Sequence, residues 1–237
     1  MATVEVHRLT KTFRSLKAVD DLTFSAPPGS VTGLLGPNGS GKTTTIRIAL
    51  GLVRPTSGNA VIDGKSYAEL AHPRRIVGTM LDASGIHPGR TGRNHLRVLA
   101  NGAGVSKARV DEVLEQVGLT DAADRRVRGY SLGMKQRLGL ASALLGDPEL
   151  LILDEPANGL DPAGIAWLRT LLRSEAAAGR TVIVSSHVLS EVEQTVDHVV
   201  IVSRGRLRFD GSLADLDSSE GSLEAGFLRL TDEKVRA

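Results

Sequence analysis

The sequence contains no cysteine among its 237 residues, and only 3% of them are aromatic. Without cysteine the chain can form no disulfide framework, no thiolate zinc site and no cysteine nucleophile, which fits a reducing compartment. The scarcity of aromatic residues leaves few platforms on which the bases of a single-stranded nucleic acid could stack. These absences exclude a disulfide-stapled protein and argue against a thiolate metal protein.

The sequence also lacks a long apolar run and a large excess of one charge. No uninterrupted apolar segment approaches the length of a membrane-spanning helix. The N-terminal stretch MATVEVHRLTKTF lacks the apolar core of a signal peptide. The formal net charge is +2, and the most basic stretch, DRRVRGY around Arg125, is typical of a solvated helix end. We therefore expect no nucleic-acid partner, and a protein that is cytoplasmic or docks on a membrane from the cytoplasmic side.

What the sequence does contain is enough apolar residues, 41%, to bury the core of one large domain. Short apolar runs separated by helical stretches predict an open α/β core with a mostly parallel sheet. Before this core, two short strands of an N-terminal antiparallel region are predicted at Thr3–Leu9 and Leu22–Ser25. The predicted strands of the core are Val31–Leu35, Ile76–Leu81, LLILD, TVIVSS and HVVIVS.

Between residues 92 and 146 the pattern becomes helical, because apolar residues recur at helical spacing in NHLRVLANGAG, ARVDEVLEQVGL and GMKQRLGLASALLG. We interpret this region as a helical lobe, about residues 83–146, inserted into an α/β domain that spans residues 1–216. We expect the last residues, 217–237, to form a short polar tail with one amphipathic turn at Leu223–Leu230.

The stretch VTGLLGPNGSGKTTTIRIALGL holds a glycine-rich loop between a predicted strand and a predicted helix. Gly36, Gly41, Lys42 and Thr43 fill the pattern G-x-x-x-x-G-K-[ST], whose glycines let backbone amides and a helix N-terminus converge on one anion. A nucleotide polyphosphate fits best, with the lysine at its outer phosphates and the threonine hydroxyl on the accompanying Mg²⁺, although a phosphate-free turn is the alternative. The expected nucleotide contacts are Gly36, Pro37, Asn38, Gly39, Ser40, Gly41, Lys42, Thr43 and Thr44.

The stretch ELLILDEPANGLDP places two adjacent carboxylates at the C-terminal end of a predicted strand, the edge where open α/β sheets bind their ligands. We expect Asp154 to hold Mg²⁺ and Glu155 to polarise the water that attacks the terminal phosphate. A helix N-cap beside an exposed acid would explain these residues taken alone. The glycine-rich loop upstream argues against that alternative.

Further features accompany the loop and the carboxylates: YSLGMKQRLGLASALL with Ser131 and Gly133, NGLDP around Asp161, VIVSSH ending in His187, and Phe13. Together they resemble the ATP-binding cassette (ABC) family, specifically the separate ATPase subunits of transporters, along nearly the whole chain. The resemblance implies a P-loop NTPase fold of the ABC ATPase type. It also implies that the first segment is the family's signature, that His187 is the switch histidine, and that Phe13 stacks on adenine.

The resemblance further implies a mechanism. A pair of subunits would sandwich ATP molecules, each site combining the phosphate loop of one chain with the signature of the other, so that Ser131 and Gly133 act in trans. The catalytic residues would be Glu155, His187 and Lys42. The ATPase would lie at the cytoplasmic face of the membrane, where hydrolysis of ATP would power separately encoded transmembrane permease subunits. We expect a homodimer that binds ATP and Mg²⁺.

This chain departs from the family pattern at some positions. Leu132 stands where the family commonly has a glycine and Met134 where it has a glutamine, and such variants resemble subunits that export drugs and antibiotics. Asp82 occupies the place of a glutamine that contacts Mg²⁺ and water. A carboxylate there can still bind Mg²⁺, but it adds negative charge beside Asp154 and Glu155. The resemblance therefore favours export of a small amphipathic molecule.

Alternative functions remain within the same family. One is a soluble ATPase that acts as a mechanical switch on the ribosome or on nucleic acid, but such relatives carry paired cassettes or long insertions, and this chain shows neither. The other is a nucleotide-binding module without turnover. The presence of Lys42, Asp154, Glu155 and His187 argues against it.

Overall fold

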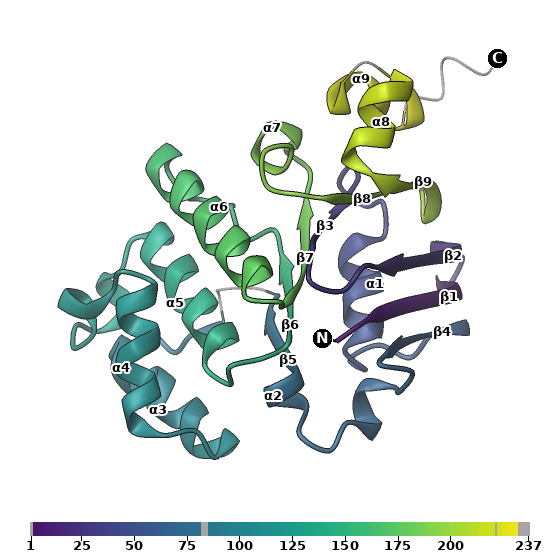
Figure 1. The fold of residues 1–237 in the computed structure, drawn as a ribbon. Coiled ribbons are helices and arrows are strands. Elements are labelled where there is room, and N and C mark those ends of the chain that lie inside the picture. The colour runs from purple at the N-terminus through teal and green to yellow at the C-terminus, as the bar shows by residue number, and fades with distance from the viewer. Residues whose placement is uncertain (1, 82–84, 221, 232–237) are drawn as a thin grey trace.

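The computed structural model describes residues 2–81, 85–220 and 222–231, whose strands form separate smaller and larger sheets (Figure 1). The smaller sheet is antiparallel in the order β2–β1–β4 and comprises β1 (Val4–Phe13), β2 (Leu16–Ala26) and β4 (Ser57–Ile62). The larger sheet has the order β5–β6–β7–β3–β8–β9 and comprises β3 (Val31–Leu35), β5 (Val77–Met80), β6 (Leu150–Asp154), β7 (Thr181–Ser186), β8 (His198–Ser203) and β9 (Arg206–Ser212).

The larger sheet is the mostly parallel core that the sequence predicts. Its described strand pairs are parallel except β8–β9, which is an antiparallel hairpin. β3, β6 and β7 are buried along their whole length, which explains why their sequences are continuous apolar runs. Because these strands are parallel, the segments that follow them meet at one edge of the sheet.

The N-terminal strands are longer than the sequence predicts. β1 continues beyond Leu9 to Phe13, and β2 begins at Leu16 instead of Leu22. The added residues are mostly exposed or half-buried, and Asp21 interrupts β2 with a φ of 54°. Their sequence therefore lacks the alternation of apolar and polar residues that is typical of a half-buried strand. Pairing between β1 and β2 makes them part of the sheet. The predicted strand ends were wrong for this reason.

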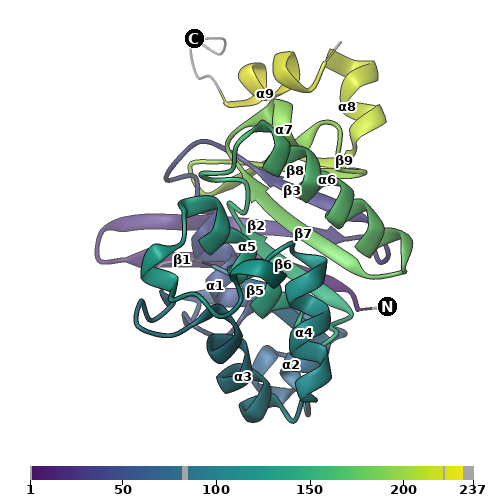
Figure 2. The same ribbon diagram turned by 90° about the vertical axis from the view of Figure 1, so that its left-hand side faces the viewer.

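Helices α3 (Gly92–Ala103), α4 (Lys107–Gln116) and α5 (Leu132–Leu144) follow β5 and precede β6, and they lie together at one end of the molecule (Figures 1 and 2). This arrangement confirms the inserted helical lobe. The other helices of the described residues are α1 (Lys42–Ala49), α2 (Pro73–Ile76), α6 (Pro162–Ala177), α7 (Leu189–Val192), α8 (Leu213–Glu220) and α9 (Leu223–Thr231). Short 3₁₀ turns lie at Tyr67–Glu69, Thr120–Ala122 and Val127–Gly129.

The helices of the lobe begin where the sequence supplies a capping hydroxyl. Thr91, Ser106 and Ser131 each accept a hydrogen bond from the backbone N–H of the residue three positions later. The inward faces of α3 and α5 carry fully buried leucines, among them Leu96 and Leu138, which belong to one core with the larger sheet. This shared core fixes the helix that starts at Ser131 against the sheet.

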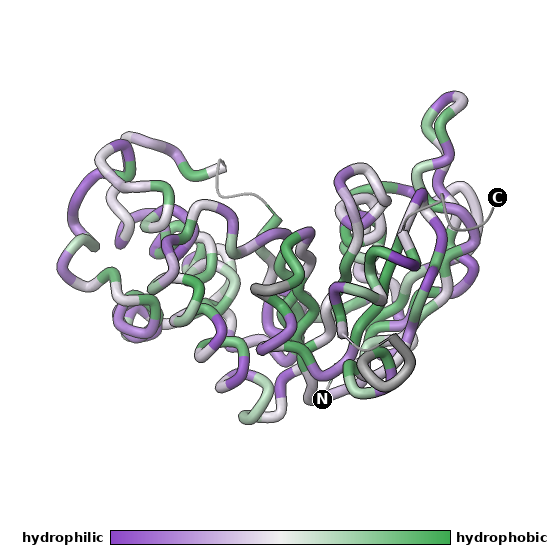
Figure 3. Tube along the Cα trace, turned by 90° about the horizontal axis from the view of Figure 1, so that it is seen from above, coloured by the Kyte–Doolittle hydropathy of each residue, from purple (hydrophilic) through white to green (hydrophobic). Residues whose placement is uncertain are grey.

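Helix α1 lies between the sheets. Ile46 and Ile48 belong to a second apolar cluster together with Val6 of β1, Ile62 of β4 and Ile152 of β6. Figure 3 shows apolar stretches running through the interior, while hydrophilic stretches lie mostly at the periphery. The packing of α1 on both sheets fixes its first turn, and with it the loop that precedes it.

Helices α8 and α9 lie at the opposite end of the molecule from α3 (Figures 1 and 2). Helix α9 is the amphipathic segment that the sequence indicates at Leu223–Leu230. The predicted boundary between residues 216 and 217 falls inside α8, and Leu216 and Leu223 are both fully buried in the main core. The division of the chain at this point stays a prediction.

Candidate functional site

The glycine-rich loop after β3 and the first residues of α1, hereafter together the phosphate loop (residues 36–44), lie at the C-terminal edge of the parallel strands. Close approach of neighbouring backbone explains its glycines. A Cβ on Gly36 would lie 2.1 Å from the carbonyl oxygen of Val202, and one on Gly41 would lie 2.5 Å from that of Ala18. Gly41 has a φ of 107° and precedes α1 without a side-chain cap. The first amides of α1 therefore lack a capping side chain and can bind an anion.

Lys42 is buried, with 5% of its surface exposed. Its Nζ donates to the carbonyl oxygen of Gly36 at 2.6 Å and lies 3.5 Å from Oε1 of Glu155. A buried ammonium needs such partners, because its charge is poorly solvated. The phosphate loop therefore holds a positive charge in place before any ligand is bound.

Asp154 ends β6 and is 7% exposed. Its carboxylate accepts hydrogen bonds from Oγ1 of Thr43 at 2.7 Å and from Oγ of Ser185 at 2.5 Å. The structure thus brings the predicted Mg²⁺ ligands Thr43 and Asp154 together as a set of oxygen atoms, the kind that Mg²⁺ prefers. The third predicted ligand, Asp82, lies outside the described residues.

Glu155 follows Asp154 with a φ of 51°, which is uncommon for a residue other than glycine. Its backbone N–H donates to Oγ of Ser185 at 2.9 Å, and its Oε2 lies 2.8 Å from Nδ1 of His187. The left-handed backbone thus sets a carboxylate between the imidazole and the ammonium of Lys42. The structure brings the predicted catalytic residues Lys42, Glu155 and His187 together.

A cleft of about 470 Å³ opens over the phosphate loop. Sequence reasoning missed three of its residues, Leu16, Ala18 and Asn158. Leu16 was missed because β2 was expected to begin later. Gly36 and Pro37 do not line the cleft, and their carbonyl oxygens instead accept from Nζ of Lys42. The lining consists of Phe13, Leu16, Ala18, Asn38, Gly39, Ser40, Gly41, Lys42, Thr43, Thr44, Glu155, Asn158 and His187.

Phe13 lies at the tip of the β1–β2 hairpin and is 46% exposed. Nζ of Lys11 lies 4.8 Å from the centre of its ring. An exposed ring that lines a cleft offers a face for stacking, and it does so at the wall formed by the hairpin and not in the apolar core. Phe13 is therefore not a core residue.

Ser131 and Gly133 lie apart from this cleft at the start of α5 and are not among the residues that line it. The neighbouring Leu132 is 58% exposed, yet it also covers Gly159, where a Cβ would lie 2.2 Å from Cδ2 of the leucine. The predicted site residues thus form two groups in one chain: a cleft around the phosphate loop, and an exposed helix start.

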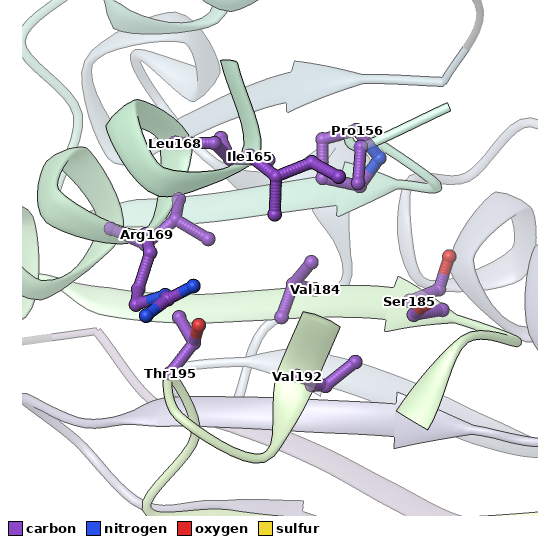
Figure 4. Close-up of a pocket in the computed structure, with 11 residues that line it drawn as sticks. Pro156, Ile165, Leu168, Arg169, Val184, Ser185, Val192 and Thr195 are labelled. Atoms are coloured by element: carbon purple, nitrogen blue, oxygen red, sulfur yellow. The ribbon is translucent and has the colours of Figure 1, made fainter. Parts of the chain in front are cut away.

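A smaller apolar cavity lies behind the carboxylates, between α6, β7 and α7 (Figure 4). Figure 4 shows Pro156, Val184 and Val192 around it, with Ile165 and Leu168 contributed by α6. Its volume of about 30 Å³ corresponds to roughly one water molecule. It therefore cannot hold a nucleotide, and the cleft over the phosphate loop is the candidate site.

Comparison with protein families and related sequences agrees with this geometry. Residues 19–158 match the family model described as ABC transporter, which is more than half of the chain. The bacitracin transport ATP-binding protein BcrA of Bacillus licheniformis is 48% identical over 84% of this chain and 66% of its own length. The lantibiotic transport ATP-binding protein SrtF of Streptococcus pyogenes is 36% identical over 88% of this chain and 92% of its own length. The chain spans about two thirds of the length of the first relative.

Solved structures support the same assignment. An ATP-binding subunit of an ABC transporter superposes with a TM-score of 0.86 at 30% identity, over 97% of this chain and 99% of that one. A bacterial Atm1-family ABC exporter with ATP bound gives a TM-score of 0.83 at 25% identity, over 98% of this chain and 42% of that one. Within the described residues, none of the helices has the length and apolar content needed to cross a membrane. The chain belongs to the ABC transporter family, as an ATP-binding subunit that hydrolyses ATP.

Proposed function

We propose that this ATPase powers the export of an amphipathic compound, of the class of peptide antibiotics, through separately encoded permease subunits. The names of BcrA and SrtF, which refer to the transport of bacitracin and of a lantibiotic, support this substrate class. They give no support to the alternative of a switch on the ribosome or on nucleic acid. The observation that carries the proposal is the convergence of Lys42, Glu155 and His187 on the cleft of the phosphate loop.

The nucleotide would lie along this cleft, with its base against Phe13 and its phosphates in the phosphate loop. The exposed ring at one end of the cleft and the uncapped start of α1 at the other end support this orientation. Nζ of Lys42 would exchange the carbonyl oxygens of the loop for phosphate oxygens, because an anion offers the stronger charge-assisted hydrogen bonds.

The residues fit a magnesium ion that accompanies the phosphates. Thr43 and Asp154 supply adjacent oxygen atoms, and Mg²⁺ is commonly bound by one or two carboxylates together with phosphates and water. When bound, the ion would neutralise phosphate charge. Asp82 is proposed to complete this set, so replacement by glutamine should preserve turnover and replacement by alanine should reduce it in a phosphate-release assay.

Glu155 would act on the attacking water. Its carboxylate faces the Lys42 ammonium, and a phosphate that takes over the lysine would leave this carboxylate available to accept a proton. Nδ1 of His187 would hold the carboxylate in position, while the rest of its ring faces the cleft where the terminal phosphate is expected.

Ser131 and Gly133 would contact the terminal phosphate of a nucleotide bound to a second copy of the chain. Their place at the start of α5, away from the cleft of their own chain, supports a role in trans. A small hydroxyl and an unshielded amide at a helix start allow close approach to an anion. We therefore propose a homodimer that closes on ATP and opens after hydrolysis.

The permease subunits would hold this dimer at the cytoplasmic face of the membrane. A groove of about 300 Å³ between α3, α5 and β5 offers them a surface, and it combines apolar residues such as Leu99 and Ala103 with Tyr67 and Arg74. The groove lies on the helical lobe, away from the nucleotide cleft, so both can be occupied at once.

The dimer is tested with Glu155→Gln, which keeps the shape of the side chain but not the base. The variant should bind ATP with Mg²⁺ without cleaving it, and light scattering coupled to size exclusion should show twice the monomer mass with ATP and the monomer mass with ADP. Adding Ser131→Arg should return the ATP sample to the monomer. A Glu155→Gln protein that binds ATP and stays monomeric at high concentration would contradict the proposed sandwich.

A further inference from the structure

The phosphate loop is fastened to segments that lie far from it in the sequence. The backbone N–H of Gly205, in the turn between β8 and β9, donates to the carbonyl oxygen of Ser40 at 2.8 Å. The carbonyl oxygen of Gly205 accepts from the backbone N–H of Asp20 in β2 at 2.8 Å. One turn residue thus connects the phosphate loop to the strand that leads from the Phe13 hairpin.

These three backbones meet without side chains between them. A Cβ on Gly205 would lie 2.9 Å from the carbonyl oxygen of Ala18, and a Cβ on Gly41 would lie 2.5 Å from the same oxygen and 3.6 Å from Cα of Gly205. The backbones are therefore packed too closely to admit even a methyl group at either glycine. A shift of the turn or of β2 must therefore shift the end of the phosphate loop.

An ion pair holds the turn against β2. Nε and Nη2 of Arg206, the residue after the turn glycine, both lie 2.7 Å from Oδ2 of Asp20, while Nζ of Lys17 lies 3.0 Å from Oδ1. The Asp20 side chain is only 15% exposed, whereas that of Arg206 is 65% exposed. The hydrogen bonds from Lys17 and Arg206 hold the pKa of Asp20 below its usual value, so the carboxylate is charged at neutral pH.

The pair acts on one part of the cleft. Leu16 and Ala18 of β2 line the cleft together with Phe13, so the turn sets the spacing between this wall and the phosphate loop. Glu155 and His187 follow β6 and β7, which lie on the other side of β3 from the β8–β9 hairpin. The turn is therefore placed to change how the nucleotide is held and not how water attacks it.

We propose that Asp20 and Arg206 form a positioning clamp that sets the affinity of the cleft for nucleotide without setting the rate of hydrolysis. The inference rests on the nucleotide site proposed above. Loss of the clamp would loosen the turn, and the phosphate loop would then have to be ordered by the nucleotide itself, at the expense of binding free energy.

The test measures ADP binding with Mg²⁺ by calorimetry and ATP turnover by phosphate release in Arg206→Gln, Arg206→Lys and Asp20→Asn. Arg206→Gln and Asp20→Asn should each raise the Kd for ADP about three- to fivefold, the size expected for a partly exposed ion pair. Arg206→Lys, which keeps the charge but not the paired donors, should fall between them and wild type. Turnover at saturating ATP should stay within about twofold of wild type.

A matched control is Arg173→Gln, which removes another Arg–Asp pair. Arg173 contacts Asp197, whose other carboxylate oxygen accepts from the backbone N–H of Val31 at the opposite end of β3. This variant should bind ADP as wild type does. The double variant Asp20→Asn, Arg206→Gln should match Asp20→Asn alone, because that single variant already removes the charge that pairs with Arg206.

The outcomes separate this inference from the proposed function. Suppose that wild type binds ADP and hydrolyses ATP. If the Kd of Arg206→Gln for ADP is then unchanged, whether or not its melting temperature falls, the pair is only structural and the proposed clamp is wrong. A fall in turnover at saturating ATP without a change in Kd also overturns it. If wild type itself binds no nucleotide, the proposed function fails instead.

Discussion

The cleft around the phosphate loop and the start of α5 differ in how far their polar groups are already paired within the chain. In and directly beside the cleft, the ammonium of Lys42, the carboxylate of Asp154 and the imidazole of His187 have partners within the chain. At the start of α5, the hydroxyl of Ser131 caps its own helix, and Leu132 is 58% exposed. The first region is assembled by folding, whereas the second offers a surface. The difference teaches that folding alone gathers the polar groups of the cleft, whereas Ser131 and Gly133 meet no such group of their own chain in it, which agrees with the proposed role of these residues in trans.

A direct contact connects these regions within the chain. Nε2 of Gln136, one turn into α5, donates to the carbonyl oxygen of Asn158 at 2.7 Å, and the N–H of Asn158 donates to the carbonyl oxygen of Glu155 at 3.2 Å. Two hydrogen bonds therefore link α5 to the loop that holds Glu155. Among the described residues, Oε1 of Gln136 is buried without a hydrogen-bond partner.

The largest effect on ATP turnover is expected when the positive charge of Lys42 is removed from the cleft. Lys42→Ala should lower ATP turnover about a hundredfold or more, because it removes the ammonium that faces the phosphates. Phosphate release at saturating ATP is the measurement, and Lys107→Ala, an exposed lysine of the lobe, is the control that should leave turnover unchanged. Turnover of Lys42→Ala at the wild-type rate would show that the loop has no role in phosphate binding.

A smaller effect on ATP turnover is expected at the contact between α5 and the loop that holds Glu155. Gln136→Met keeps the volume of the side chain but removes its hydrogen bond, so the acid loop loses one restraint, and turnover should fall about fivefold with ADP affinity unchanged. Gln116→Met is the matched control, since Nε2 of Gln116 donates to Oε1 of Glu175 at 2.8 Å, away from the acid loop. Equal turnover of both variants would mean that the α5 contact does not reach Glu155.

A modest change in affinity is expected at the wall of the cleft. Phe13→Ala should weaken ATP binding about fivefold, because base stacking is worth on the order of 1 kcal/mol. Phe13→Tyr keeps the ring and should bind as wild type does. Fluorescence titration with a nucleotide analogue would measure both, and equal weakening by both variants would identify the ring as a structural element of the hairpin.

The smallest effect concerns the stability of the lobe. Burial lowers the pKa of His95 on α3 from its usual value of 6.5, and the nearby Arg90 acts in the same direction. The unfolded chain therefore takes up a proton below about pH 6.5 that the folded chain resists, so stability should fall as the pH drops. Urea unfolding at pH 7.5 and 5.5 should show a larger loss for wild type than for His95→Gln, and equal losses would contradict this.

The sequence predicted the phosphate loop and the carboxylate pair because both depend on short local patterns. Val31–Leu35 and LLILD are buried strands whose apolar runs are visible without any contact information, and the predicted site residues lie at their ends or directly after them. The wall formed by Leu16 and Ala18 was not predicted, because the polar hairpin tip has no periodic pattern and forms only through pairing with β1. No sequence pattern predicts that Gly205 and Arg206 contact Asp20 either, because these contacts form only when the β8–β9 turn packs on β2.

The sequence alone determined which groups are the candidates for the chemistry: a lysine and a threonine after glycines, adjacent acids at the end of a strand, and a histidine after another strand. Only the tertiary structure decided how these groups are used. Parallel pairing of β3, β6 and β7 brings Lys42, Asp154 and His187 to one edge from positions far apart in the chain. The same packing leaves Ser131 outside that cleft, because its helix is held on the lobe by a buried core. Strand pairing and burial act between distant segments, so no local pattern reveals which groups meet and which remain exposed.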